Sequence, residues 1–302
     1  MLRQAAIQWN LIFMWRQARS CQEKVSRRCT KDRGSPSLRK GNCFIPHPKL
    51  TPFPEINEML AQLVLGILRV LDQDVVGVYV HGSLALGDFN RETSDVDFLV
   101  ATRTELSAEK LPALEQMHAE LRDQGFKWAC NMEGSYISQK LLKRYDPERC
   151  WHPALRCDGS FGVDGHGSDW IIQRAILREY GLTLHGPAPD ILIDPVAPAE
   201  LKKAAQAILT EWWSPLFKDA SRLNSSEYQA YAILTMCRCL YTIEEGLVAS
   251  KPAAAQWVLD TSHGSKWELL IRQALAWRNG DGLNAIDQTL AFVRYTLERA
   301  GK

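Results

Sequence analysis

Two aspartates separated by one residue carry the clearest chemical signal in the chain. Asp95 and Asp97 lie in the segment Thr93-Ser-Asp-Val-Asp-Phe-Leu-Val100, whose apolar residues predict a β-strand. Alternate side chains of a strand share a face, so both carboxylates point the same way while Val96 and Phe98 face the core. Carboxylate oxygens are preferred ligands of Mg²⁺, which typically completes its shell with substrate phosphates. The spacing therefore predicts a magnesium site that handles a nucleotide.

A turn upstream of the aspartates could hold the phosphates. The apolar run Val75–Val80 predicts another strand, and His81-Gly82-Ser83 follows it. Gly82 lets the backbone approach a phosphate without a Cβ in the way, and Ser83 offers a hydroxyl and an amide to the same anion. Ser94 is the third predicted phosphate ligand. An isolated Asp-x-Asp is more often a polar strand end, but its combination with this turn favours a nucleotide site.

The elements that would position these residues alternate between strands and helices. Apolar residues at three- and four-residue steps predict an amphipathic helix from Ile56 to Leu71 and another over 107–124, and residues 128–137 predict a third strand. After about residue 196 the pattern predicts helices only. We therefore expect an α/β region over 51–195 and an all-helical region over 196–302, with the boundary in Asp190–Pro198 and a ligand bound between the two.

Charge is divided unevenly along the chain. The 36 Lys and Arg against 35 Asp and Glu give a net charge of +1, which predicts no strong field for nucleic acid or an anionic membrane. Residues 1–50, however, hold eleven basic and two acidic side chains, and the remaining residues hold 25 basic and 33 acidic ones. We expect residues 1–50 to be a disordered basic extension without a catalytic role, a nucleic-acid-binding arm being the alternative.

The composition indicates a soluble cytoplasmic protein. No apolar run approaches the eighteen or so residues of a membrane span. The eight cysteines include no CxxC pair, which predicts reduced thiols rather than a disulfide framework. The spacing of Cys150, His152, Cys157 and His166 matches no familiar zinc site.

The combination of Gly82-Ser83 at a strand end with Ser94-Asp-Val-Asp97 on a second strand resembles the polymerase-β-like nucleotidyltransferase superfamily. From Thr51 onward the chain looks like the aminoglycoside adenylyltransferases that modify streptomycin and spectinomycin. The resemblance implies an α+β fold, with a mixed-sheet nucleotidyltransferase domain followed by an all-helical C-terminal domain. It also implies that Asp95 and Asp97 hold Mg²⁺ on ATP.

The resemblance assigns roles to four further residues. Glu133, in Asn131-Met-Glu-Gly-Ser-Tyr136, matches the catalytic base and completes the predicted metal set with the two aspartates. Arg238 and Lys251 match an arginine and a lysine at the triphosphate, where cations would neutralise the transferring phosphate and the departing pyrophosphate. Tyr295 matches a tyrosine near the nucleotide. Taken alone, each would be an ordinary strand or helix residue.

The acceptor is less well specified. The family's streptomycin site uses acidic residues ahead of the arginine-bearing helix, where this chain has Asn224 and Tyr228 and only Glu227 is acidic. Glu227, Asp164 and Asp169 could still bind a cation. Trp212 and Trp213 could stack on a sugar ring, although packing in a buried helical face is the more common use.

These observations predict a monomeric Mg²⁺-dependent enzyme that transfers AMP from ATP to a hydroxyl of a small cationic acceptor of the aminoglycoside type and releases pyrophosphate. Such an enzyme would confer antibiotic resistance, and it would bind neither nucleic acid nor membrane. Two alternatives stay open. One is nucleotide transfer to a protein or another small molecule, and the other is a nucleotide-binding regulatory module without turnover.

Overall fold

The computed structural model describes residues 50–261, 263–278 and 281–301, so the predicted basic extension lies outside the described residues except for Leu50. The chain forms two compact units that alternate along the sequence. Among the described residues, the sheet unit contains residues 50–81, Asp95–Gly165 and Gly181–Leu192. The helical unit contains Gly82–Ser94, His166–Tyr180 and the described residues from Ile193 onward. Two segments of the predicted α/β region therefore belong to the helical unit, and the contiguous division at residue 195 stays a prediction.

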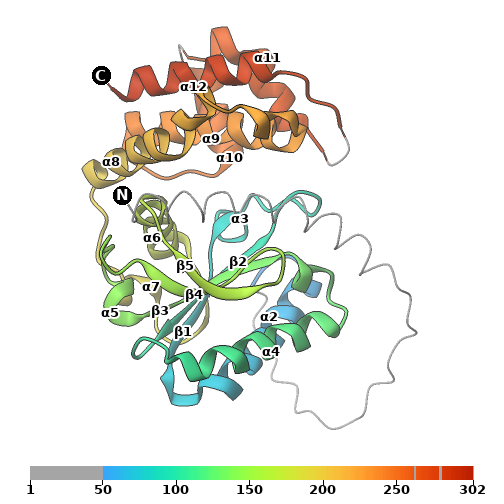
Figure 1. The fold of residues 1–302 in the computed structure, drawn as a ribbon, viewed down its shortest axis with the longest axis vertical. Helices are drawn as coiled ribbons and strands as arrows, with labels where there is room; N and C mark the ends of the chain where they lie inside the picture. The colour runs from blue at the N-terminus through green and yellow to red at the C-terminus, as the bar shows by residue number, and fades with distance from the viewer. Residues whose placement is uncertain (1–49, 262, 279–280, 302) are drawn as a thin grey trace. The chain divides into compact units, whose positions relative to one another are not determined.

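The sheet unit is built on a mixed six-stranded sheet of order β5-β4-β3-β2-β1-β6 (Figure 1). Its strands are β1 (Val75–Val80), β2 (Val96–Thr102), β3 (Met132–Ser138), β4 (Trp151–Leu155), β5 (Phe161–Gly165) and β6 (Leu182–His185). The β2–β3 pair is parallel, and the other neighbouring pairs are antiparallel. This confirms the predicted mixed sheet and its first three strands. The patterns missed β4, β5 and β6, which are short and not strongly apolar.

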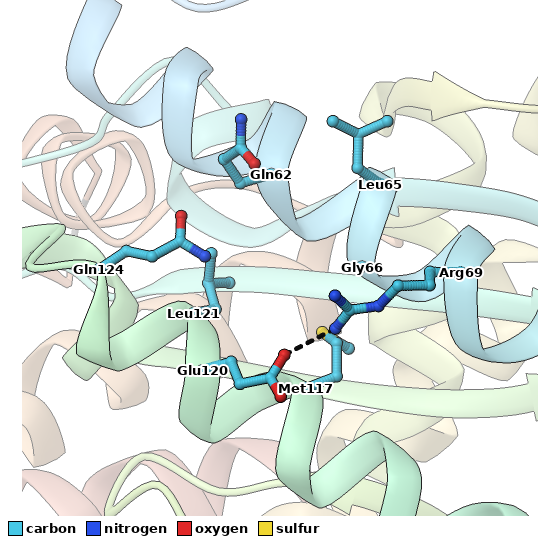
Figure 2. A pocket seen from close by; sticks show the side chains of 8 residues that line it. All are labelled: Gln62, Leu65, Gly66, Arg69, Met117, Glu120, Leu121 and Gln124. Carbon is cyan, nitrogen blue, oxygen red and sulfur yellow. Dashed lines mark hydrogen bonds and ion pairs between the residues drawn. The ribbon is translucent and has the colours of Figure 1, made fainter. Parts of the chain in front are cut away.

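Helices α2 (Pro54–Leu71) and α4 (Leu111–Asp123) pack on each other and against the sheet (Figure 1). The apolar face of α2 is buried as its spacing predicts, through Ile56, Met59, Leu60, Leu63, Val64, Ile67 and Leu71. The helices approach closely where Gly66 meets Met117, since a Cβ on Gly66 would lie 2.7 Å from the methionine sulfur. A shallow pocket on this surface contains an exposed ion pair of 2.7 Å between Arg69 and Glu120 (Figure 2).

An aromatic cluster defines the face of the sheet that α4 covers. Nε2 of His118, on α4, lies 2.7 Å from the Tyr136 hydroxyl, and its ring contacts those of Phe98 and Phe161. Burial lowers the pKa of His118 to about 3, so this histidine is neutral. Because strand side chains alternate, Asp97 and Glu133, the neighbours of Phe98 and Gly134, project from the opposite face.

The helical unit is organised around α9 (Ser226–Glu245), which packs against α8 (Pro198–Ile208), α10 (Lys251–Asp260), α11 (Gly264–Ala276) and α12 (Ile286–Ala300). Helix α6 (Asp169–Tyr180) packs on α8 and on the short α3 (Gly82–Ala85), and α8 continues into a π-helical turn, Leu209–Trp213. The helices predicted after residue 196 are therefore confirmed.

The remaining helical segments are short. They are α5 (Gln139–Leu142), α7 (Pro189–Leu192) and the 3₁₀ turns Asp72–Asp74, Ala108–Lys110, Lys127–Cys130, Ser214–Phe217 and Ser221–Asn224. Among the described residues, no helix combines the length and the apolar character that crossing a membrane requires. The cysteines described are free thiols at positions 130, 150, 157, 237 and 239.

Candidate active site

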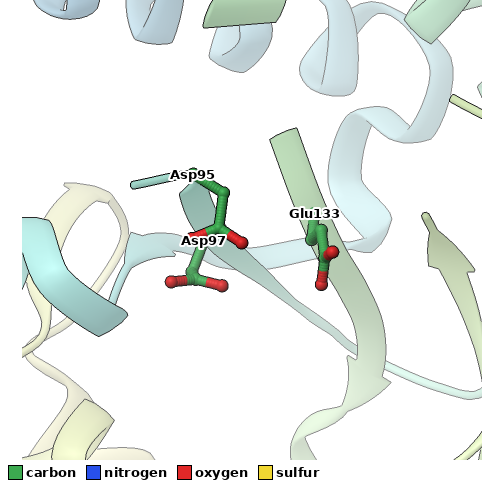
Figure 3. Close-up of side chains that lie close together, drawn as sticks. All are labelled: Asp95, Asp97 and Glu133. Carbon is green, nitrogen blue, oxygen red and sulfur yellow. The ribbon is translucent and has the colours of Figure 1, made fainter. Parts of the chain in front are cut away.

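Three carboxylates converge on the open face of β2 and β3. The parallel register places Asp97 directly beside Glu133, and Asp95 lies just before β2 begins. One oxygen atom from each carboxylate lies within 4.8 Å of the others, and Figure 3 shows the side chains grouped at the ends of the two strands. The structure therefore brings together the complete metal set that the sequence predicts.

The electrostatics of this carboxylate triad favour a bound cation. Burial raises the pKa of Glu133 well above its ordinary value of 4.5, and Asp95, Cys157 and Asp97 act in the same direction. Hard carboxylate oxygens in a mutually repelling group fit a divalent cation such as Mg²⁺, which would relieve the repulsion. A carboxylate with raised proton affinity is also suited to accept a proton from a hydroxyl group.

Cys157, which follows β4, is a neighbour of the triad that the sequence patterns did not connect with it. Its thiol hydrogen-bonds with the Glu133 side chain. The antiparallel pairing of β3 with β4 joins Gly134 to Leu155 and so brings the residues after β4 to the beginning of β3, where Glu133 lies. Because β4 itself was not predicted, no sequence signal pointed to this contact.

The turn after β1 has two of the features predicted for a phosphate ligand. Gly82 adopts a φ of +63°, a conformation that favours glycine. The Ser83 hydroxyl is buried and has no hydrogen-bond partner among the described residues, which leaves it available to an anion. The Ser94 hydroxyl instead accepts a hydrogen bond of 3.0 Å from the backbone N–H of Asn90 and stabilises the turn before β2. All three predicted phosphate ligands belong to the helical unit.

The predicted cations Arg238 and Lys251 share a neighbour, Tyr231. Nζ of Lys251 lies 4.6 Å from the centre of the Tyr231 ring. Burial raises the pKa of the Tyr231 hydroxyl to about 12, while the Arg238 charge acts in the opposite direction. Tyr231 lies seven residues before Arg238 on α9, two helical turns away on the same face. The seven-residue spacing alone indicates that Tyr231 and Arg238 share a face of the helix. Only the structure shows that Tyr231 also contacts Lys251.

Lys251 is anchored through the residue before it. Ser250 caps α10, because its hydroxyl accepts a hydrogen bond of 3.2 Å from the N–H of Ala253. The same hydroxyl donates to the carboxylate of Asp88, in the loop that carries Gly82 and Ser83. A serine before Lys-Pro predicts a helix cap, but the sequence does not identify Asp88 as its partner.

Tyr295 belongs to a network inside the helical unit. Its hydroxyl lies 2.5 Å from Nδ1 of His263, and Nε2 of that histidine lies 2.9 Å from Oε1 of Glu244. Arg299 contacts the same glutamate oxygen at 3.0 Å. These contacts orient the Tyr295 ring, and its role near a nucleotide stays a prediction.

The three carboxylates considered for acceptor binding differ in their surroundings. Asp164 forms an ion pair with Arg156, whose Nε lies 3.0 and 2.9 Å from the two carboxylate oxygens, and this pairing argues against binding of an external cation. Asp169 begins α6, and Glu227 is exposed near the start of α9. Trp213 packs in a buried helical face and is not available to stack on a sugar ring, since this residue is buried and stacks on Tyr228.

Comparison with known proteins agrees with this geometry. Residues 62–137 match the family model of the nucleotidyltransferase domain, and residues 191–300 match that of the aminoglycoside adenylyltransferase C-terminal domain. These matches indicate a nucleotidyltransferase that is similar to the aminoglycoside adenylyltransferases. Both matched segments of this nucleotidyltransferase contain predicted site residues, the triad in the first and Arg238, Lys251 and Tyr295 in the second.

Relatives of this adenylyltransferase-like chain cover most of its length. An aminoglycoside (3'') (9) adenylyltransferase of Escherichia coli is 26% identical over 253 residues, which are 80% of this chain and 93% of the relative. A spectinomycin 9-adenylyltransferase of Campylobacter jejuni is 23% identical over 220 residues, 68% of this chain and 79% of the relative.

A solved structure shares the fold. The spectinomycin adenyltransferase of Enterococcus faecialis, determined with ATP and spectinomycin, superposes with a TM-score of 0.62 at 17% identity. The match covers 82% of this chain and 99% of that one. The predicted fold is therefore confirmed.

Proposed function

We propose that this protein transfers AMP from Mg²⁺-bound ATP to a hydroxyl group of a small cationic aminoglycoside-type acceptor and releases pyrophosphate. The convergence of Asp95, Asp97 and Glu133 within 4.8 Å carries the proposal. One relative is named for adenylyl transfer to aminoglycosides and another for transfer to spectinomycin, which supports an acceptor of this class for this chain. This activity would confer antibiotic resistance, and it would take place in the cytoplasm, where ATP and Mg²⁺ are present.

The carboxylate triad would hold the cation and activate the acceptor. A Mg²⁺ ion held by Asp95, Asp97 and Glu133 would neutralise phosphate charge and reduce the repulsion among the carboxylates. Glu133 accepts the proton of the acceptor hydroxyl as its oxygen forms a bond to the α-phosphorus. The bond from that phosphorus to the pyrophosphate oxygen breaks, and pyrophosphate leaves.

The remaining predicted residues would bind the nucleotide. Gly82 and the unpartnered Ser83 hydroxyl are suited to a phosphate group, and Ser94 shapes the same loop. Arg238 and Lys251 would stabilise the negative charge on the transferring phosphate and the leaving group. Tyr295 would lie near the nucleotide. We assign these roles to a nucleotidyltransferase domain over 51–195 and a helical C-terminal domain over 196–302. In this proposal the protein acts as a monomer and binds no nucleic acid.

A panel of acceptors tests the proposal directly. Purified protein is incubated with MgATP and with streptomycin, spectinomycin or other aminoglycosides, and mass spectrometry detects the gain of one AMP. We expect modification of at least one compound with equimolar release of pyrophosphate, and neither reaction with Asp97→Asn. Transfer of AMP to a protein and to no panel member would favour the alternative acceptor. Tight ATP binding by calorimetry without any transfer would favour a regulatory module.

A further inference from the structure

The β4–β5 hairpin brings an uncharged side chain to the carboxylate triad. Cys157 is the second residue after β4, and its thiol hydrogen-bonds with the Glu133 side chain. A carboxylate offers about four lone-pair sites, so Glu133 can take part in this bond and bind a cation at the same time. The thiol can therefore restrict the orientation of Glu133 without occupying the metal site.

The turn that carries Cys157 is closed by short hydrogen bonds. The backbone N–H of Arg156 donates to the carbonyl of Ser160 at 2.9 Å, and that of Gly159 donates to the carbonyl of Arg156 at 2.8 Å. The N–H of Ser160 donates to the side chain of Asp158 at 2.9 Å. Gly159 adopts a φ of +80°, which favours glycine. These bonds fix the backbone on both sides of Cys157 and limit where its thiol can lie.

Two contacts hold the hairpin itself in place. Nε of Arg156 lies 3.0 and 2.9 Å from the carboxylate oxygens of Asp164, on β5, and both side chains are largely buried. Nη1 of the same arginine donates to the Ser160 hydroxyl at 3.2 Å. Gly159 packs against Arg122 of α4, since a Cβ at this position would lie 3.0 Å from the guanidinium carbon. The position of the thiol is therefore set by the sheet and by α4.

The thiol acts from outside the metal set. Among the described residues, the ligand atoms that lie within 4.8 Å of one another come from Asp95, Asp97 and Glu133, and the Cys157 sulfur is not one of them. Mg²⁺ also prefers oxygen ligands, whereas thiolates suit softer metals. A hydrogen-bond partner orients a metal-ligating carboxylate, and an uncharged partner does so without cancelling the negative charge that attracts the cation.

We propose that Cys157 is a positioning residue, whose thiol holds the Glu133 carboxylate in the orientation that binds Mg²⁺ and accepts the proton of the acceptor hydroxyl. The inference rests on the proposed function, because it assigns the residue that orients the proposed base. The β4–β5 hairpin thereby contributes to catalysis, although none of its side chains belongs to the triad.

Cysteine variants separate positioning from packing. Cys157→Ala removes the hydrogen bond, and Cys157→Ser retains a hydroxyl in its place. Cys150→Ala is the matched control, because this cysteine is also partly exposed and directly precedes the same strand, β4. Kinetics at saturating Mg²⁺ give kcat and both KM values. Electron paramagnetic resonance of free Mn²⁺, which also binds carboxylate oxygens, gives the metal affinity without turnover.

The expected effects follow from the loss of one oriented carboxylate. Cys157→Ala should lower kcat and Mn²⁺ affinity each by about tenfold or more, with KM for ATP and for acceptor within about twofold of the parent. Cys157→Ser should restore most of both losses, and Cys150→Ala should match the parent. In a Glu133→Gln background, Cys157→Ala should cause no further loss of Mn²⁺ affinity, because the thiol acts through Glu133.

The serine variant and the metal titration decide the outcome. Equal losses in Cys157→Ala and Cys157→Ser, or a raised acceptor KM at unchanged kcat, would indicate packing of the hairpin and overturn the inference. Unchanged kcat and Mn²⁺ affinity in Cys157→Ala would also overturn it. Circular dichroism verifies the fold, and Cys157→Val replaces the alanine variant if that variant is unfolded. If the parent modifies no acceptor, the proposed function fails, and the Mn²⁺ affinities still decide whether Cys157 positions Glu133.

Discussion

The hydroxyl of Ser250 donates a hydrogen bond to the carboxylate of Asp88, and this contact joins two segments that are 162 residues apart in the sequence. Ser250 directly precedes Lys251, and Asp88 lies in the loop that begins with Gly82 and Ser83. The predicted phosphate loop and the predicted cation of α10 are therefore held together by one side-chain pair. Both segments belong to the helical unit.

We predict that Asp88→Ala weakens ATP binding. Loss of the acceptor frees the loop from α10, so KM for ATP should rise about three- to tenfold and the free energy of unfolding should fall by about 1 kcal/mol. Steady-state kinetics and urea unfolding measure both effects. Glu92→Ala is the control, because this residue of the same loop forms an exposed ion pair of 3.7 Å with Arg278. Additive effects of Asp88→Ala and Ser250→Ala in a double-mutant cycle would contradict the coupling.

Removal of charge from the triad should abolish transfer with little effect on the fold. We expect Asp97→Asn and Glu133→Gln each to reduce the rate of pyrophosphate release by about 10²- to 10⁴-fold, the range typical of lost acid–base catalysis. Glu58→Gln, on the exposed side of α2, should retain the parent rate. A parent-like rate in Asp97→Asn would exclude this group of carboxylates as the catalytic centre.

Stabilisation by Mg²⁺ should depend on pH. The pKa of Glu133 is raised in the folded state, so its contribution to stability is complete below its ordinary value of 4.5 and is lost as the pH rises through the folded value. A divalent cation that replaces the proton should therefore raise Tm more at pH 8 than at pH 5. Thermal unfolding with and without Mg²⁺ measures the difference, with Glu133→Gln as the control. An equal increase in Tm at both pH values would contradict the prediction.

The ring of Tyr231, rather than its hydroxyl, should matter for Lys251. Tyr231→Phe keeps a ring beneath the ammonium group, whereas Tyr231→Ala removes it. We expect KM for ATP to rise several-fold in the alanine variant and to change less than twofold in the phenylalanine variant. An equal loss in both variants would show that the hydroxyl group is required.

Close packing in β3 should make Gly134 intolerant of a side chain. A Cβ on this residue would lie 2.2 Å from the Phe98 ring, which is fully buried. We expect Gly134→Ala to lower the free energy of unfolding by about 1–3 kcal/mol, the usual cost of overpacking. Gly282→Ala, where a Cβ meets nothing within 4 Å, should unfold like the parent in urea.

The sequence patterns predicted the strongly periodic parts of the fold. Helix α2 follows its apolar spacing, and β1 and β2 are short apolar runs with clear ends. The hairpin of β4 and β5 was not predicted because Trp151-His-Pro-Ala-Leu155 and Phe161-Gly-Val-Asp-Gly165 contain proline, glycine and charge within short strands. Such strands form because they pair with neighbours, and a single segment does not encode that pairing.

The candidate site was predictable where the motif is local. Asp95 and Asp97 follow from one strand, and Glu133 required the family resemblance because β3 is separated from β2 by a helix. The contacts of Cys157, Tyr231 and Asp88 depend on tertiary packing, so no sequence spacing identifies them.

The side-by-side placement of Asp97 and Glu133 in parallel strands makes the distance between the two carboxylates a property of strand register, independent of linker length. Insertions or deletions in the connecting segment, such as near residues 103–110, can therefore accumulate during evolution without displacing either carboxylate. A one-residue insertion within β3 before Glu133 would instead turn the carboxylate toward α4. Divergent members of this family should consequently vary in the length of this crossover while the number of residues from each strand end to its carboxylate stays constant.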